Sequence, residues 1–168
     1  MKRSGANSGK TPIKRIFVDA NTIISGLLFR GNKSLLLRLG MIRLCELVTS
    51  EFVFKEVERA LRSSRFGISE DEVTFLTSYL HRCVRVRPSP SPKEISLNLA
   101  RLEDKKDVHV LVAFERLGCD FLLTGDSELL SKVKCAKRTR QILELLLRDS
   151  ATGWEDGGVD CQQRTPSE

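Results

Sequence analysis

The stretch KRIFVDANTIISG, from Lys14 to Gly26, decides the fold class of this chain. At its centre lies Ile16–Val18, a short apolar run of the β-branched and aromatic kind that is typical of a buried strand. Asp19 ends the run, and Asn21 and Thr22 can begin a helix. In open parallel α/β sheets, ligands bind at the carboxyl ends of the strands, and Asp19 is expected at such an end. The alternative is that Asp19 only caps the helix.

The rest of the chain alternates between short strand patterns and longer helical patterns. The expected strands are Ile16–Val18, Leu47–Thr49, Cys83–Arg87, Phe121–Leu123 and Val133–Ala136. The helical patterns cover about residues 21–28, 35–44, 51–61, 70–80, 105–117, 127–133 and 139–147. Pro88, Pro90 and Pro92 predict an extended connection between two of these elements. The alternation predicts a three-layer α/β/α sandwich with a mostly parallel central sheet.

Composition sets the broad class of the protein. The 168 residues suffice for one domain with a real core, and 40% of them are hydrophobic. We expect a disordered basic tail at 1–12, a folded domain at 13–148 and a disordered tail at 149–168. The net charge of +6 allows a polyanionic partner such as nucleic acid. Without a membrane-length apolar run or a signal-peptide core, the expected location is the cytoplasm, with no membrane partner.

Four acidic residues stand at the edges of apolar elements. Asp19 and Asp126 each follow directly on a buried strand. Glu56 falls roughly 80° from the centre of the apolar face of its helix, closer than Glu58 does. Asp107 precedes three apolar residues at helical spacing and therefore heads the buried stripe of its own helix. Taken singly, each has a plain structural explanation: helix capping for the aspartates, and a surface ion pair for Glu56.

Taken together, the four acids predict a metal site. The carboxyl ends of parallel strands lie at one edge of a sheet, so the four side chains are expected to converge. Carboxylates at close range repel one another, and one would protonate unless a cation joined them. Hard oxygen ligands favour Mg²⁺ or Mn²⁺, and such ions activate water and stabilise charge during displacement at phosphorus.

Four segments in this order resemble the PIN-domain ribonucleases, of the kind found as toxins of bacterial toxin–antitoxin pairs. They are FVDANTIISGLL, the helix that carries Glu56, DKKDVHVLVAF and FLLTGDSELL, and the resemblance runs from about Ile13 to Leu147. It implies one metal site formed by Asp19, Glu56, Asp107 and Asp126, with Asp104 as a further ligand or supporting acid. It also implies Mg²⁺ or Mn²⁺ as cofactor, RNA as substrate and an antitoxin protein as partner. Ala20 departs from the family, which usually has a hydroxyl residue there.

Two other functions remain open on sequence grounds. A haloacid-dehalogenase-like phosphatase would need an acid two residues after its nucleophile, and Asn21 cannot supply one. A PIN-like module that binds RNA or protein without cutting would keep the same acids. A homodimer also remains open, because the sequence does not reveal the oligomeric state. Three groups of basic residues could hold RNA, without any signal for choosing among them: Arg30, Lys33, Arg38 and Arg43; Lys105 and Lys106; and Lys132, Lys134, Lys137, Arg138 and Arg140.

Overall fold

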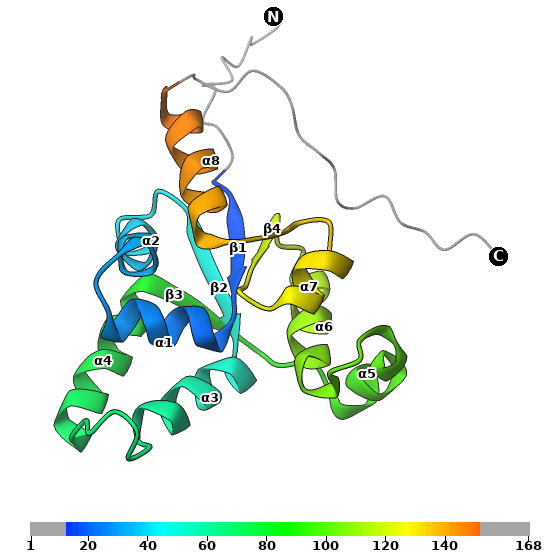
Figure 1. Ribbon diagram of the computed structural model, residues 1–168, viewed down its shortest axis with the longest axis horizontal. Helices are drawn as coiled ribbons and strands as arrows, with labels where there is room; N and C mark the ends of the chain where they lie inside the picture. Colours follow the sequence, from blue (N-terminus) through cyan, green and yellow to red (C-terminus); the bar gives the residue numbers. More distant parts are fainter. Residues whose placement is uncertain (1–12, 152–168) are drawn as a thin grey trace, which may run out of the picture.

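The computed structural model describes residues 13–151, and the two expected tails lie almost entirely outside this range. Five parallel strands form one sheet in the order β3-β2-β1-β4-β5. They are β1 (Arg15–Val18), β2 (Glu46–Ser50), β3 (Val84–Arg87), β4 (Phe121–Leu123) and β5 (Ala136–Lys137). The predicted α/β sandwich with a parallel sheet is confirmed (Figure 1).

Helices cover both faces of this sheet. In chain order, the first four helices are α1 (Ala20–Leu28), α2 (Asn32–Met41), α3 (Glu51–Leu61) and α4 (Glu70–Cys83). The next four are α5 (Pro92–Leu97), α6 (Val108–Arg116), α7 (Ser127–Lys132) and α8 (Thr139–Ala151). Short 3₁₀ turns lie at Leu99–Arg101 and Lys105–Asp107. In Figure 1, α5, α6 and α7 lie on one side of β1, with α1, α2 and α4 on the other, and α8 returns beside α2.

The central strands are buried because helices pack on both faces. Ile16, Phe17 and Val18 of β1 have no exposed surface. Continuous apolar runs of this kind are what a parallel sheet covered on two sides requires. Helix α2 approaches its neighbours closely at Gly40, where a Cβ atom would lie 2.6 Å from the carbonyl oxygen of Cys83 at the end of α4 and 2.7 Å from Cδ1 of Leu47 in β2. Gly40 therefore sets how closely α2 packs on the sheet.

Four of the predicted elements differ clearly from the structure, and the first is α2, which covers Asn32–Met41 instead of about 35–44. The expected extended connection after Pro88 contains α5, which begins with Pro92 at its first position and is capped by a reciprocal pair of hydrogen bonds between Ser91 and Glu94. Proline is tolerated in the first helical turn because its missing N–H has no helical partner there. The last strand is Ala136–Lys137 rather than Val133–Ala136, and α8 continues to Ala151, past the predicted domain end at 148.

The strand order creates a switch point beside β1. From β1 the chain moves outward to β2 and β3, and it later returns to the other side of β1 as β4 and β5. The connections on the two sides of β1 therefore diverge at the carboxyl ends of β1 and β4. In open α/β sheets this divergence leaves a crevice, and ligands bind there.

Candidate active site

Asp19 lies at the switch point and is 8% exposed. One of its carboxylate oxygens, Oδ1, accepts a hydrogen bond from the Thr22 amide at 2.8 Å and so caps α1. The other, Oδ2, accepts a hydrogen bond from the Thr124 hydroxyl at 2.6 Å. The capping role considered for Asp19 is therefore real, and it fixes the carboxylate at the end of β1.

Thr124 connects the two strand ends. Its hydroxyl donates to Asp19 and accepts a hydrogen bond from the Asp126 amide at 3.0 Å. Asp126 in turn caps α7, because its Oδ1 accepts from the Leu129 amide at 2.8 Å. Two aspartates from distant parts of the chain are thus held on either side of one buried threonine. A hydroxyl that both donates and accepts can serve such a bridge.

Asp107 lies between the 3₁₀ turn and α6, half-buried and without a capping hydrogen bond from its side chain. Burial raises the pKa of its carboxyl group from 3.8 to about 6. Nearby negative charges act in the same direction, and they belong to Asp126, Asp104, Asp19 and Glu128. The repulsion predicted for converging carboxylates is therefore felt most strongly at Asp107.

Glu56 on α3 faces the same cluster. Burial raises the pKa of Glu56, and the negative charges of Asp107 and Asp19 raise it further, while Arg59 lowers it. Its Oε2 lies 3.6 Å from Nε2 of His109 on α6. The charges of Asp107 and Asp19 thus act on Glu56 from two other elements of the fold.

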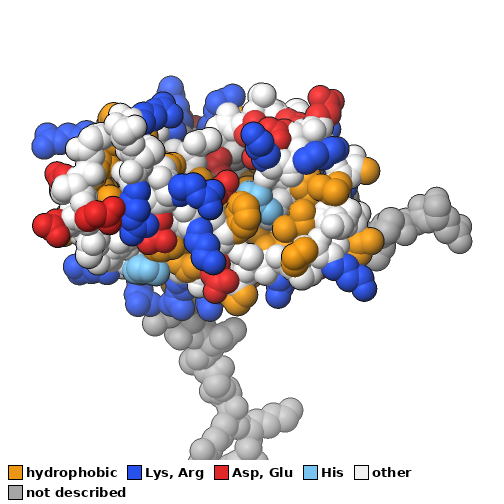
Figure 2. All heavy atoms as spheres, turned by 90° about the horizontal axis from the view of Figure 1, so that it is seen from below, with side chains coloured by type: hydrophobic (Ala, Val, Ile, Leu, Met, Phe, Trp, Pro, Cys, Tyr) orange, Lys and Arg blue, Asp and Glu red, His pale blue; other side chains and the backbone are white. Residues whose placement is uncertain are grey.

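His109 is buried beneath this cluster. It is 6% exposed, and its ring centroid lies 4.2 Å from that of Phe52. Burial lowers the pKa of His109 to about 4, so the imidazole is neutral at pH 7 and its contact with Glu56 is not an ion pair. Within residues 13–151, Nδ1 of His109 has no hydrogen-bond partner. Figure 2 views the molecule from the carboxyl ends of the strands, and acidic, basic and hydrophobic side chains all reach the surface on this face.

Asp104 lies in a loop whose backbone is hydrogen-bonded to the side chain of Glu128. The Glu128 carboxylate accepts hydrogen bonds from the amides of Glu103 at 2.6 Å and Asp104 at 3.1 Å. It also pairs with Lys132 one turn along α7, and these contacts lower the pKa of Glu128 to about 2. The carboxylate of Asp104 itself is exposed and accepts a hydrogen bond from the Lys106 amide at 2.9 Å.

Comparison with known proteins gives the family. A family model described as the PIN domain matches residues 15–128. The chain belongs to the PIN-domain family. Among solved structures, it is similar to PAE2754 from Pyrobaculum aerophilum, with 20% sequence identity and a TM-score of 0.55 over 83% of this chain and 97% of that one. That likeness concerns the fold. No match was found among the curated proteins.

PIN domains are generally nucleases that act on RNA and use divalent metals. The match favours this function over the dehalogenase-like alternative. As the side chains lie within residues 13–151, no three acidic, histidine or cysteine groups are close enough to hold one ion. The donor chemistry nevertheless suits a hard cation, because a half-buried carboxylate with its pKa raised by other carboxylates lacks a positive partner. In the same range, no helix is long and apolar enough to cross a membrane.

Sequence reasoning named the acids of this PIN domain but missed the residues that hold them. Thr124 entered only as part of a turn, although a threonine directly after a buried strand was a usable signal. Glu128 gave no signal, because a glutamate in the first turn of a short helix is ordinary. Sequence reasoning also missed the contact of His109 with Glu56, whose Oε2 lies 3.6 Å from Nε2 of the histidine.

Proposed function

We propose that this PIN domain is a metal-dependent endoribonuclease in which Asp19, Glu56, Asp107 and Asp126 hold Mg²⁺ or Mn²⁺. Asp104 lies at the edge of this group as a further ligand or a supporting acid. The observation that supports the proposal most is the raised pKa of Asp107, which burial and the surrounding carboxylates produce together. A protein gains nothing in stability from such repulsion, whereas a cation would relieve it.

The residues of the chain have distinct tasks in this proposal. Asp19 and Asp126 each use one oxygen to cap a helix, which leaves Oδ2 of Asp126 free, while Oδ2 of Asp19 is oriented by Thr124. Asp107 and Glu56 contribute carboxylates from the opposite wall. Neutral His109 contacts Glu56, with Nε2 3.6 Å from Oε2, and adds no positive charge there. When bound, the metal would activate water and stabilise negative charge at the phosphodiester.

The proposal extends to the biological role. We propose that the nuclease is the toxin of a toxin–antitoxin pair, with an antitoxin protein as its partner in the cytoplasm. Resemblance to toxins of this family supports this part. Induced expression of the wild-type protein alone should arrest growth of a bacterial host, and Asp19→Asn should not. Equal growth with both would contradict the toxin role while leaving the nuclease proposal intact.

Cleavage of RNA tests the enzymatic proposal directly. The purified protein is incubated with labelled structured and unstructured RNAs in EDTA, in Mg²⁺ and in Mn²⁺. We expect internal cuts with metal and none in EDTA, and no cuts by Asp19→Asn under any condition. Equal cutting by wild type and Asp19→Asn would reduce Asp19 to a helix cap and contradict the proposed metal site. RNA binding without any cutting by wild type would identify an inert module instead.

A further inference from the structure

A hollow of about 450 Å³ opens beside the acid cluster, between the beginnings of α2 and α8. Thr22 and Thr124 form part of its wall, and both of them also donate hydrogen bonds to Asp19. The hollow and the candidate active site therefore share a boundary. Its size lies at the lower end of the range for small-molecule sites, which suits a single nucleotide.

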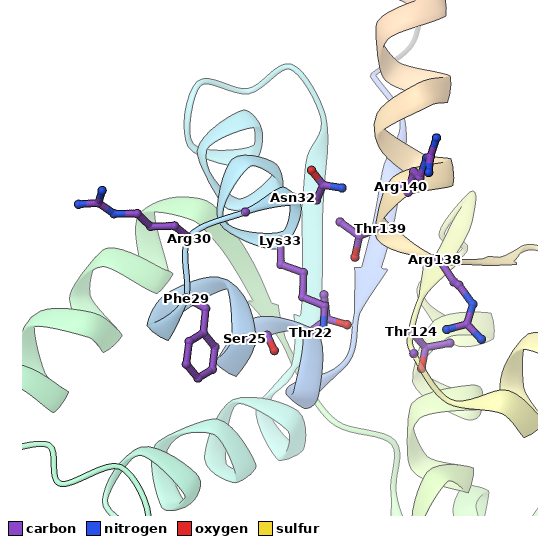
Figure 3. A pocket seen from close by; sticks show the side chains of 12 residues that line it. Thr22, Ser25, Phe29, Arg30, Asn32, Lys33, Thr124, Arg138, Thr139 and Arg140 are labelled. Carbon is purple, nitrogen blue, oxygen red and sulfur yellow. The ribbon is translucent and has the colours of Figure 1, made fainter.

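Four cations line the hollow: Arg30, Lys33, Arg138 and Arg140. Lys33 is half-buried at the beginning of α2, and exposed Arg138 directly precedes α8. Within the part of the chain that the structure describes, neither forms an ion pair, whereas Arg140 pairs with Glu144 at 3.0 Å. In Figure 3, Lys33 extends toward Thr22 on one wall and Arg138 lies beside Thr124 on the other, while Arg30 points away.

Backbone groups add to the positive character of the hollow. Helix α2 begins at its wall with Gly31 as N-cap, which offers no side-chain hydrogen bond to the free amides of the first turn. A Cβ atom at Gly31 or at Gly125 would meet nothing within 4 Å, so a ligand can approach the backbone there. Helix α8 also begins at this wall, with Thr139. Amides at helix beginnings attract anions, and here they line the same hollow as Lys33 and Arg138.

We propose that this hollow binds a backbone phosphate of the RNA next to the phosphodiester that is cut, with Lys33 and Arg138 as its charged contacts. The inference rests on the proposed function for the identity of the ligand. An RNA chain bound at the acid cluster carries its next phosphates beyond the boundary formed by Thr22 and Thr124. Those phosphates need cations, because the acids repel them. Two of the three basic groups in the sequence meet at this one place.

Direct binding measurements test the proposal without relying on catalysis. The probe is a fluorescently labelled single-stranded RNA oligonucleotide, titrated in EDTA at several salt concentrations and followed by anisotropy. The variants are Lys33→Gln, Arg138→Gln and the pair together. Lys93→Gln on α5 is the control, because it removes the same charge from a residue that does not line the hollow. Thermal melts establish that every variant is folded.

We expect each single variant to bind RNA about tenfold more weakly than Lys93→Gln does, as suits the loss of a hydrogen bond between charged groups. For the double variant, the slope of log K against log salt should fall in magnitude by about 0.7, the value for one phosphate that is no longer neutralised. Excess inorganic phosphate should compete only weakly, since it makes none of the remaining chain contacts. Affinity and slope equal to those of the control would overturn the inference.

The two proposals fail in different ways. If wild type never cuts RNA yet Lys33→Gln and Arg138→Gln weaken RNA binding, the nuclease proposal is wrong and the phosphate site stands. If wild type cuts RNA and both variants bind like Lys93→Gln, the phosphate site is wrong and the nuclease proposal stands. Binding of inorganic phosphate as tight as that of RNA, abolished by the same variants, would identify a free-anion site and also overturn the inference.

Discussion

Replacing Asp107 with asparagine should stabilise the metal-free protein at neutral pH. The carboxyl group has a pKa of about 6 in the fold instead of 3.8, so the folded state binds its proton more tightly than the unfolded state does. The free energy of unfolding therefore falls as pH rises from about 3.8 through 6. Asparagine carries no charge, so the free energy of unfolding of the variant does not fall with pH for this reason. The gain should be absent below about pH 4 and complete above about pH 7.

The magnitude follows from the two pKa values. At about 1.4 kcal/mol per pH unit, a rise from 3.8 to about 6 corresponds to at most about 3 kcal/mol. Asp107 is only half-buried, so solvent screens part of this repulsion. We therefore expect a gain of about 1–2 kcal/mol at pH 7.5, or about 3–6 °C in Tm.

Urea unfolding in EDTA at pH 4, 5, 6 and 7.5 measures this difference. Asp71→Asn is the control, because Asp71 is exposed in the first turn of α4, between Glu70 and Glu72, and is not among the charges that raise the pKa of Asp107. Its carboxylate favours the helix beginning, so its loss should cost a few tenths of a kcal/mol at neutral pH. An Asp107→Asn variant whose stability matches wild type at every pH would refute the claim that the carboxylates repel one another.

Three further outcomes follow from the same site. Asp19→Asn should abolish RNA cleavage while the protein stays folded, because asparagine has nearly the same shape as aspartate but binds a divalent ion more weakly. If the variant cleaved RNA at the wild-type rate, Asp19 would be only a helix cap. Millimolar Mg²⁺ or Mn²⁺ should raise Tm relative to EDTA, and equal midpoints would count against a preformed acidic site. Thr124→Val should cost about 1–3 kcal/mol, because it leaves the buried Oδ2 of Asp19 without its 2.6 Å partner, and chemical denaturation would measure the loss.

The sheet could be predicted because its strands are simple. A parallel strand buried on both faces is continuously apolar, so Ile16–Val18 and Phe121–Leu123 were visible without any tertiary information. Helix α5 was missed because three prolines suggested an extended chain. Yet Ser91, Pro92 and Glu94 form a regular helix beginning, and giving capping more weight than proline content would have found it.

The candidate site divides in the same way. Asp19 and Asp126 could be singled out because Asp19 directly follows an apolar strand and Asp126 follows another after only two residues. The hydrogen bonds that the amides of Glu103 and Asp104 donate to Glu128 could not be predicted, because they join residues that are 25 and 24 positions apart in the sequence. The meeting of Lys33 with Arg138 was equally hidden. Both are ordinary surface cations until the sheet brings the beginnings of α2 and α8 together.

The strand order also bears on when this protein can become active during its synthesis. Strand β1 is made first, yet its second neighbour in the sheet, β4, leaves the ribosome only after more than a hundred further residues. The hydrogen bond between Asp19 and Thr124 spans 105 positions. A nascent chain that ends before β4 carries Asp19, Glu56 and Asp107 but lacks the strand that orients Asp19. Long-range pairing of this kind forms late. If the chain is the nuclease proposed above, a partly made chain is therefore expected to be inactive, and cleavage would begin only when the domain is nearly complete.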